Sequence, residues 1–215
     1  KYYIIQTRAA DRAANVQNGF TDSVSSSAFI WDKTPPTSTI IQPLDTGKYR
    51  PDNLTGVIAL NGTATDAALP FVGILVSSPQ VHVSYLDGGT TYYWTGASFS
   101  SWTVTFDGAW QTAEGSTTWK YNFSGPDWVS DKNYTLRVRA FDKAGPLGVN
   151  GGNEQNPWTV HTFVVDGTPP VSRVSTPMAG SYIQSTLPQL SGTSYGGASG
   201  LQAGAPGLKL RVYYI

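Results

Sequence analysis

The sequence predicts an all-β protein built as a sandwich of short strands, on three observations. First, 13% of the residues are aromatic and there is a single Met, a composition that favours strands over helices. Second, short runs of alternating polar and apolar residues are separated by turns rich in Gly, Pro, Asp and Asn. Third, the stretch "FIWDKTPPTSTIIQP" returns later in the chain as "FVVDGTPPVSRVSTP", which indicates an internal repeat.

Eight strand-like runs lie within residues 34–167. The clearest run, residues 134–142, has a period of two, so one of its faces is expected to be buried and the other to face water. The predicted runs are 37–42, 56–64, 81–87, 91–94, 101–106, 117–123, 134–142 and 159–166. The residues expected to point inward are Val81, Val83, Tyr85, Tyr134, Leu136, Val138 and Ala140.

The repeated stretches, residues 29–43 and 163–177, are called here the first seam and the second seam. Residues 2–15 also match 133–145, and residues 180–194 echo 47–64, so the same features recur in the same order. The sequence therefore predicts three parts. Residues 1–33 would be the end of one repeat, 34–167 a complete repeat, and 168–215 the start of another. Both ends fall within alternating runs, so we expect an internal piece of a longer protein.

The Pro-Pro pair in each seam is expected to stiffen the junction between neighbouring units. Proline donates no backbone hydrogen bond, and it restricts the residue before it to extended geometry. Such a pair ends one ladder of hydrogen bonds and stiffens the start of the next strand. We therefore expect short, stiff junctions that make an array of units rod-like.

Charge and cysteine content exclude several classes of partner and site. The 14 basic and 14 acidic residues balance, which disfavours binding to nucleic acid or to an anionic membrane. The absence of Cys rules out disulfides and thiolate metal sites. No apolar run is long enough to insert into a membrane, and residues 1–11 lack the layout of a signal peptide. The expected partners are neighbouring repeats or copies of the same protein.

Two features of each repeat carry a resemblance to a known family. A turn of the form D-x-A-(G/A), at 11–14 and 142–145, is followed by a variable loop and then by "F-x-x-D-x-T-P-P". This order resembles tandem bacterial Ig-like repeats of large surface and adhesin-type proteins. The resemblance implies Ig-like sandwiches and an extracellular or cell-surface location in a bacterium. The complete unit is longer than the roughly 100 residues of an Ig domain, so extra strands or loops are expected within 87–129.

Four aspartates are candidate ligands for Ca²⁺. Asp11 and Asp32 belong to one junction, and Asp142 and Asp166 belong to the other. Ca²⁺ takes six to eight oxygen ligands, which loop carboxylates and carbonyls from adjoining units could supply together. The alternative is that these aspartates cap tight turns through their own side chains. The calcium interpretation rests on the recurrence of these residues at the seams and on the resemblance to calcium-stiffened surface repeats, and the two interpretations stay open.

An aromatic-rich region offers a different function. Trp94, Trp102 and Trp110 could form a flat platform that stacks against sugars, which would make the chain a carbohydrate-binding module of an exported polysaccharide-active protein. Surface glycans would then be partners. The alternative is that these rings fill the sandwich core and form cross-strand pairs.

No catalytic residues are expected. His82 and His161 each stand alone on a strand-like run, and the chain contains only two glutamates. His161, Asp166 and Ser172 supply the residue types of a catalytic triad, but they lie in a repeated seam without a nucleophile-elbow motif. The sequence therefore predicts a protein that is not an enzyme.

The expected function is structural or adhesive: a spacer within a long secreted surface protein or fibre. The two end segments come from opposite parts of the same repeat. One molecule could therefore complete its neighbour's sandwich by strand addition, giving head-to-tail assembly. The alternative is a covalent continuation of the array, which would complete the ends in the same way.

Overall fold

The computed structural model describes residues 1–54, 56–66, 79–123, 128–144, 152–184, 186, 189–203 and 207–213. Within these ranges the chain is all-β, with fifteen strands and three short 3₁₀ helices. No helix among the described residues has the length and apolar character needed to span a membrane.

The bounds of the elements are as follows. The strands are β1 (Tyr2–Gln6), β2 (Ser26–Ile30), β3 (Thr37–Gln42), β4 (Gly47–Tyr49), β5 (Gly56–Thr65), β6 (Gln80–Asp87), β7 (Thr90–Trp94), β8 (Phe99–Ser100), β9 (Gln111–Thr112), β10 (Glu114–Gly115), β11 (Thr118–Phe123), β12 (Lys132–Arg139), β13 (Thr159–Val165), β14 (Val171–Thr176) and β15 (Ser191–Tyr195). The 3₁₀ helices are η1 (Pro51–Leu54), η2 (Asp107–Ala109) and η3 (Gly197–Ser199).

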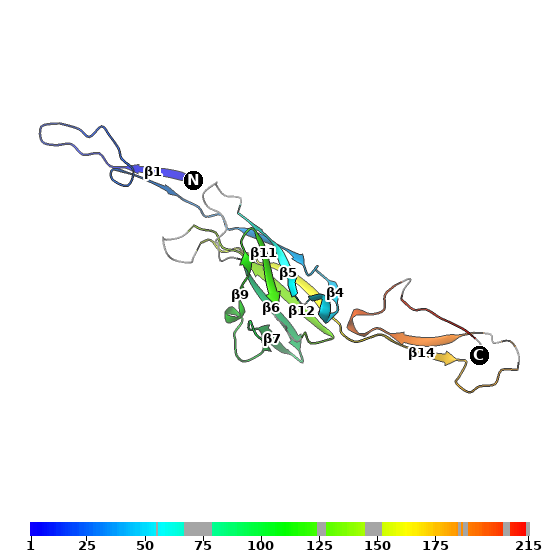
Figure 1. Ribbon diagram of the computed structural model, residues 1–215. Coiled ribbons are helices and arrows are strands. Elements are labelled where there is room, and N and C mark those ends of the chain that lie inside the picture. The colour runs from blue at the N-terminus through cyan, green and yellow to red at the C-terminus, as the bar shows by residue number, and fades with distance from the viewer. Residues whose placement is uncertain are drawn as a thin grey trace.

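The centre of the molecule is a sandwich of two sheets (Figure 1). One sheet has the strand order β10-β11-β5-β3. The other has the order β4-β13-β12-β6-β7-β8, and β9 also pairs with β6. Neighbouring strands run antiparallel except for β4 and β13, which are parallel. Because each sheet has one apolar face, the two faces pack together and are removed from water.

The core contains side chains from both sheets. Its aromatic members lie between the layers, and the largest fully buried side chains include Trp94, Trp119 and Tyr134. Trp94 Nε1 donates a hydrogen bond of 2.9 Å to the hydroxyl of Tyr121, so this buried donor is satisfied inside the sandwich. All seven residues that the sequence predicts to point inward are buried. On β12 burial alternates as expected, whereas on β6 His82 and Ser84 of the other face are buried as well.

One predicted strand is wrong. Residues 101–106 form a bend instead of a strand, although Trp102, Val104 and Phe106 alternate with polar residues. The hydroxyl of Ser100 accepts hydrogen bonds from the backbone N–H groups of Trp102 and Thr103, and this local turn competes with strand pairing. Within residues 87–129, where extra strands or loops are expected from the length of the unit, the structure has β7 to β11 and η2.

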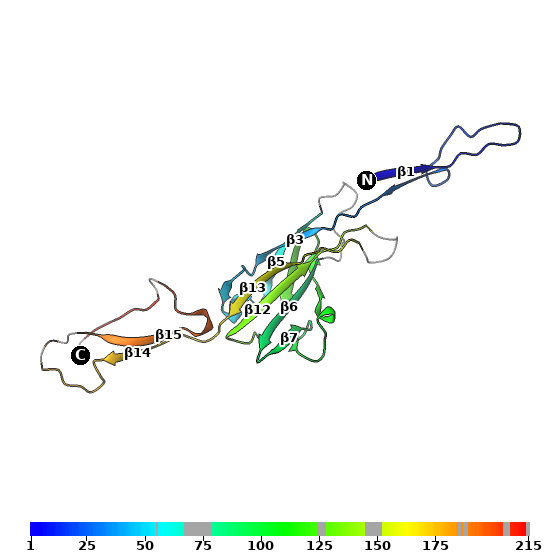
Figure 2. The same ribbon diagram turned by 180° about the vertical axis from the view of Figure 1, so that it is seen from behind.

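Two separate hairpins flank the sandwich at its opposite ends (Figures 1 and 2). The N-terminal hairpin is β1 paired with β2, and its register places Tyr3 opposite Phe29. The same register occurs in the sandwich, where β12 and β13 place Tyr134 opposite Phe163. The rings stack in both pairs, at 5.3 Å and 17° in the hairpin and at 5.6 Å and 18° in the sandwich.

The C-terminal hairpin is β14 paired with β15, and it reproduces the pairing of β3 with β5. Val174 lies opposite Gly192, as Ile40 lies opposite Gly62, and a register shift follows directly in both pairs. A Cβ atom at either glycine would collide with a carbonyl oxygen of the paired strand. Glycine thus allows the same close approach of the two backbones in both places.

Candidate metal centre

Three carboxylates meet at the first seam, where the chain enters the sandwich. Asp32, Asp66 and Asp142 each offer an oxygen atom, and these oxygens lie within 4.8 Å of one another. Asp142 is fully buried, and the other two aspartates are partly buried. The three residues come from distant parts of the sequence, so the cluster is produced by the fold.

Strand pairing brings Asp66 to the seam. β3 starts at Thr37, which pairs with Thr65 at the end of β5. Because the two strands are antiparallel, the residue that follows Thr65 lies beside the segment that precedes Thr37. Asp66 is that following residue, and Asp32 lies on that preceding segment.

A second contact brings Asp142 to the same end of the sandwich. Thr159 opens β13 and pairs with Val138 near the end of β12. The hydroxyl of Thr159 also donates a hydrogen bond of 2.6 Å to the carbonyl oxygen of Ser38 on β3. The end of β12 is therefore held beside the start of β3, and Asp142 follows that end.

Asp142 is fixed in its orientation by a clamp of hydrogen bonds. Its Oδ1 accepts from the backbone N–H groups of Ala144 (2.9 Å) and Asn153 (2.8 Å), and its Oδ2 accepts from Asn153 Nδ2 (2.8 Å). Asn153 Nδ2 also reaches the carbonyl oxygen of Asp32 at 3.3 Å. Gly152 lies so close that a Cβ there would collide with Asp142. One amide side chain thus ties the sandwich to the linker.

The electrostatics of the cluster favour a bound cation. The carboxylate oxygens lie within 4.8 Å of one another. At an effective dielectric constant of about 20, two negative charges at that distance repel by about 3 kcal/mol. Neither Asp32 nor Asp142 takes part in an ion pair with a described residue. Asp32 Oδ1 accepts from Thr34 N at 2.9 Å, whereas Asp32 Oδ2 is shielded from solvent and accepts no hydrogen bond from the described residues. A buried anionic oxygen in this state is costly.

The donor set suits a hard divalent ion. Ca²⁺ binds oxygen ligands at 2.3–2.6 Å and tolerates irregular geometry, so oxygens separated by up to 4.8 Å fit on one coordination sphere. Asp32, Asp66 and Asp142 would supply carboxylate oxygens, and the three negative charges would be balanced by the ion and its remaining ligands. The residues present therefore fit Ca²⁺.

The observed cluster differs from the predicted grouping. Asp32 and Asp142 were predicted as candidate ligands at different junctions, yet they meet at one. Asp66 was missed, although it lies two residues after the predicted run 56–64 and directly after the last residue of β5. Asp11 and Asp166 do not belong to the cluster. Its position just after a predicted strand was the signal in the sequence that could have identified Asp66.

Asp11 caps a turn, which was the alternative interpretation. Its carboxylate accepts hydrogen bonds from Ala13 N (2.9 Å), Asn15 N (2.8 Å) and Asn15 Nδ2 (2.7 Å). These bonds, with the Asn15 side chain first, hold the pKa of Asp11 below its ordinary value. The arrangement repeats the clamp of Asp142 by Asn153. Gly145, the last residue of the second D-x-A-(G/A) turn, lies outside the described residues.

Asp166 anchors the second seam through backbone amides. Its carboxylate accepts hydrogen bonds from Thr168 N (2.9 Å) and Ser199 N (2.8 Å), and the bonds from Ser199 come first among the causes that lower the pKa of Asp166. Lys48 donates to the carbonyl oxygen of Ser199. Gly197 has φ +63° and lies against Asp166, so the turn at η3 docks closely only with glycine there.

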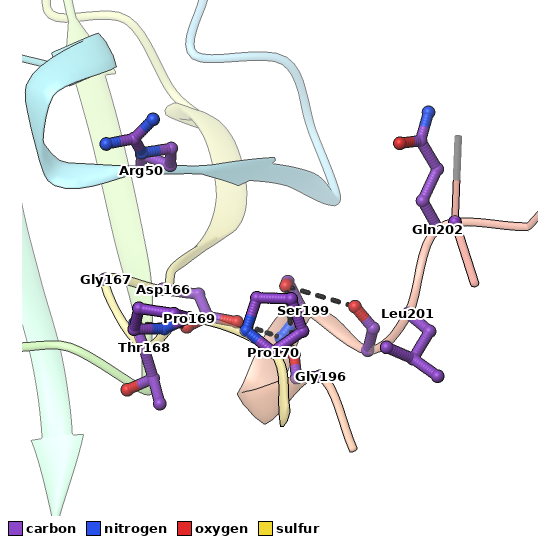
Figure 3. Close-up of a pocket in the computed structure, with 12 residues that line it drawn as sticks. Arg50, Asp166, Gly167, Thr168, Pro169, Pro170, Gly196, Ser199, Leu201 and Gln202 are labelled. Carbon is purple, nitrogen blue, oxygen red and sulfur yellow. Dashed lines mark hydrogen bonds between the residues drawn. The ribbon is translucent and has the colours of Figure 1, made fainter. Parts of the chain in front are cut away.

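An open pocket of about 630 Å³ lies beside this second anchor (Figure 3). Arg50 comes from the sandwich side, and Leu201 and Gln202 come from the segment after η3. Asp166 is the only acid among the residues that line it, and its carboxylate is already occupied by amide donors. The second seam therefore closes through hydrogen bonds, whereas the first seam gathers carboxylates.

The proposed sugar platform is wrong for Trp94, because this side chain is only 1% exposed. It packs in the core against Phe123, with the two ring centroids 4.8 Å apart. Trp110 is half-buried beneath the guanidinium of Arg139, at 4.3 Å. Of the three tryptophans only Trp102 is open to solvent, at 87% exposure. The core-packing alternative holds for Trp94.

Behind the core, a second aromatic group covers the outer face of the larger sheet. His82 on β6 is fully buried there, with ring centroids of Phe106 at 4.5 Å, Trp110 at 5.2 Å and Tyr93 at 5.4 Å. Neither ring nitrogen of His82 has a hydrogen-bond partner among the described residues. Burial first, and then the positive charge of Arg137, lowers the pKa of His82 to about 4. The imidazole is therefore neutral at pH 7.

Two of the three residues that supply the types of a triad, His161 and Asp166, are engaged in other contacts. His161 Nδ1 lies 2.8 Å from the carbonyl oxygen of Pro43. Asp166 accepts amide hydrogen bonds at the second seam, as described above, and Ser172 is exposed on β14.

Comparison of the chain with protein-family models, with curated proteins and with solved structures finds no match. The resemblance to tandem Ig-like repeats therefore rests on the sequence motifs alone.

Proposed function

We propose that the chain is a structural spacer: a segment of a long, secreted bacterial surface protein or extracellular fibre. In this proposal, residues 34–167 form one complete Ig-like sandwich unit. Residues 1–33 are the last strands of a preceding unit, and residues 168–215 are the first strands of a following one. The unit's role is mechanical, because each sandwich adds length and each seam sets the angle to the next unit.

The observation that carries this proposal is the repetition of register. The N-terminal hairpin has the pairing of β12 with β13, and the C-terminal hairpin has the pairing of β3 with β5. This repetition supports the proposal that parts of the same kind of unit stand before and after the complete one, since the two hairpins lie at opposite ends of the sandwich (Figure 2). The proposal assigns no catalytic residue. The carbohydrate-binding alternative loses one of its three rings, because Trp94 is buried.

In this proposal a Ca²⁺ ion closes the first seam. Asp32 belongs to the linker, whereas Asp66 and Asp142 belong to the sandwich, so an ion held by all three ties the preceding hairpin to the unit. Asp32 Oδ2 supports this role, since it is shielded from solvent and lacks a partner among the described residues. Millimolar Ca²⁺, which extracellular modules commonly bind, would then stiffen the first seam. The second seam, closed by amides, would not need the ion.

Small-angle scattering of the dilute chain tests the spacer function. In Ca²⁺ we expect the profile of one elongated, rigid particle, because both seams are closed. After chelation we expect added flexibility, since the N-terminal hairpin is released while the C-terminal hairpin stays anchored at Ser199. Profiles of independently moving parts in both conditions would contradict the stiff spacer.

A further inference from the structure

We propose that residues 101–110 form an acid-sensitive lid over His82, which is closed while the imidazole is neutral and opens when the imidazole takes up a proton. The lid begins after β8 and ends where β9 begins. It covers the outer face of the larger sheet, on the side away from the core. The inference goes beyond the proposed spacer function and does not depend on it.

The backbone of the lid is not hydrogen-bonded to the sandwich. Residues 101–110 belong to no strand, and all their hydrogen bonds with described residues are made within residues 100–109. A segment without ladder hydrogen bonds opens at a lower free energy than the strands around it. The lid can therefore open while the two sheets stay paired.

Side-chain packing holds the lid on the sheet. Phe106 and Trp110 lie against His82, with ring centroids at 4.5 and 5.2 Å. Trp158, which precedes β13, packs on both lid rings, at 5.6 and 5.1 Å. Ala109 of the lid is 0% exposed, although it is not part of the core cluster between the sheets. The lid thus closes a small apolar group of its own.

The closed lid leaves a charged His82 without support. The side chain is fully buried, and neither ring nitrogen has a hydrogen-bond partner among the described residues. On β12, Arg137 stands directly opposite His82 and forms no ion pair with a described residue. Arg139 follows on the same face and lies over Trp110. A protonated imidazole in this place would face a second cation in a shielded environment, which is costly.

The other polar groups around His82 do not reverse this balance. Asp107 in η2 attracts a proton to His82, but this effect is smaller than that of either arginine. Glu154 is paired with Arg139 at 2.9 Å. Tyr93 on β7 meets the imidazole with its ring, at 5.4 Å between centroids, and β9 carries no charged residue.

The open lid accepts the proton more readily than the closed lid. An imidazole in water titrates near pH 6.5, whereas burial, and then the charge of Arg137, lowers the pKa of His82 to about 4 in the closed lid. Acid therefore shifts the equilibrium towards the open lid. The difference between the two values raises the ratio of open to closed lid by about 100-fold between pH 7 and pH 4. The outer aromatic face would then be presented to solvent mainly in acid.

Thiol labelling tests the inference, because the chain has no cysteine of its own. Ala109→Cys places a thiol under the lid, and Ala64→Cys places one in the core, where Ala64 is 1% exposed. Each labelling rate is divided by the rate of the same variant unfolded in denaturant at the same pH, which removes the pH dependence of the thiol itself. We expect the corrected rate of Ala109→Cys to rise by about 100-fold between pH 7 and pH 4. At each pH it should exceed that of Ala64→Cys by at least about 10-fold, because local opening needs less free energy than global unfolding.

His82→Phe in the Ala109→Cys background is the matched control. It keeps a ring beneath the lid and removes the titrating group, so the corrected labelling rate should be the same at pH 7 and pH 4. A rate for Ala109→Cys that does not rise in acid would overturn the inference. So would a rise that survives His82→Phe, or equal corrected rates for Ala109→Cys and Ala64→Cys, which would indicate global unfolding alone.

Solvent exchange of the Trp110 indole proton gives the same readout in the unmodified chain, without a new side chain under the lid. Trp110 Nε1 is shielded from solvent. Trp119 Nε1, which donates to Thr63 within the smaller sheet, is the internal control. After correction for the intrinsic exchange rate at each pH, the Trp110 proton should exchange faster than the Trp119 proton and should accelerate in acid. Equal protection of the two indoles would contradict the lid, even where Ala109→Cys itself disturbs the packing.

Discussion

Replacement of Trp119 by Ala is expected to lower the free energy of unfolding by about 3–5 kcal/mol, the usual cost of deleting a large buried aromatic side chain. Trp119 is completely buried on β11. Its ring lies directly over Gly62 on the neighbouring strand, and its Nε1 donates to the carbonyl oxygen of Thr63 at 3.2 Å. The substitution therefore leaves a cavity and also removes this partly buried hydrogen bond.

Urea unfolding monitored by circular dichroism measures this loss, and Trp102→Ala is the matched control. Trp102 is 87% exposed, so its removal should change the free energy of unfolding by no more than about 0.5 kcal/mol. A comparable loss for both tryptophans would show that the core does not lie where the two sheets place it.

Stability is expected to fall as the pH is lowered from about 6.5 to about 4, because of His82. The folded protein holds the pKa of His82 at about 4, whereas an imidazole in the unfolded chain titrates near 6.5. The unfolded state therefore binds the proton first, and its uptake favours unfolding. The stabilisation is fully present above pH 6.5 and is lost towards pH 4. Its magnitude is on the order of 3 kcal/mol.

His82→Phe isolates this contribution. The ring stays within the same aromatic group, and no hydrogen bond to a described residue is lost, because neither imidazole nitrogen has such a partner. We expect similar stability at pH 7 and a much flatter dependence between pH 6.5 and 4, measured by urea unfolding at each pH. An equally steep dependence in the variant would assign the effect to other groups.

The sequence predicted those parts of the fold that depend on local pattern. Alternation identified the buried faces of β6 and β12, because a period of two is visible within a single strand. It failed for residues 101–106, where the Ser100 hydroxyl holds a turn that alternation does not reveal. It also gave no sign that His82, in the middle of β6, would be buried on the outer face, since that depends on a loop folding back over the sheet.

The candidate site was only partly predictable for a similar reason. The repeated seam drew attention to Asp32 and Asp142, but which carboxylates meet depends on contacts between parts of the chain that are 34 to 110 residues apart (Asp32 to Asp66 and Asp32 to Asp142). Asp66 joins the cluster through the pairing of Thr37 with Thr65. Asp11 and Asp166 share the sequence context of Asp32 and Asp142, and amides occupy the carboxylate of Asp142 as they do those of Asp11 and Asp166. What distinguishes Asp32 and Asp142 is the cluster that the fold forms around them. The repeated motif therefore identified two of the three aspartates in the cluster, but it did not predict which residues they would meet.

Thermal unfolding of the full chain, after exhaustive chelation and then in millimolar Ca²⁺, tests most directly whether an ion closes the first seam. A ligand that binds only the folded state raises its stability, so we predict a rise in Tm of about 3–6 °C. Asp66→Asn, which removes one charge of the cluster, should abolish most of the rise, whereas Asp11→Asn should preserve it. An unchanged Tm, or a rise that survives Asp66→Asn, would contradict the assignment.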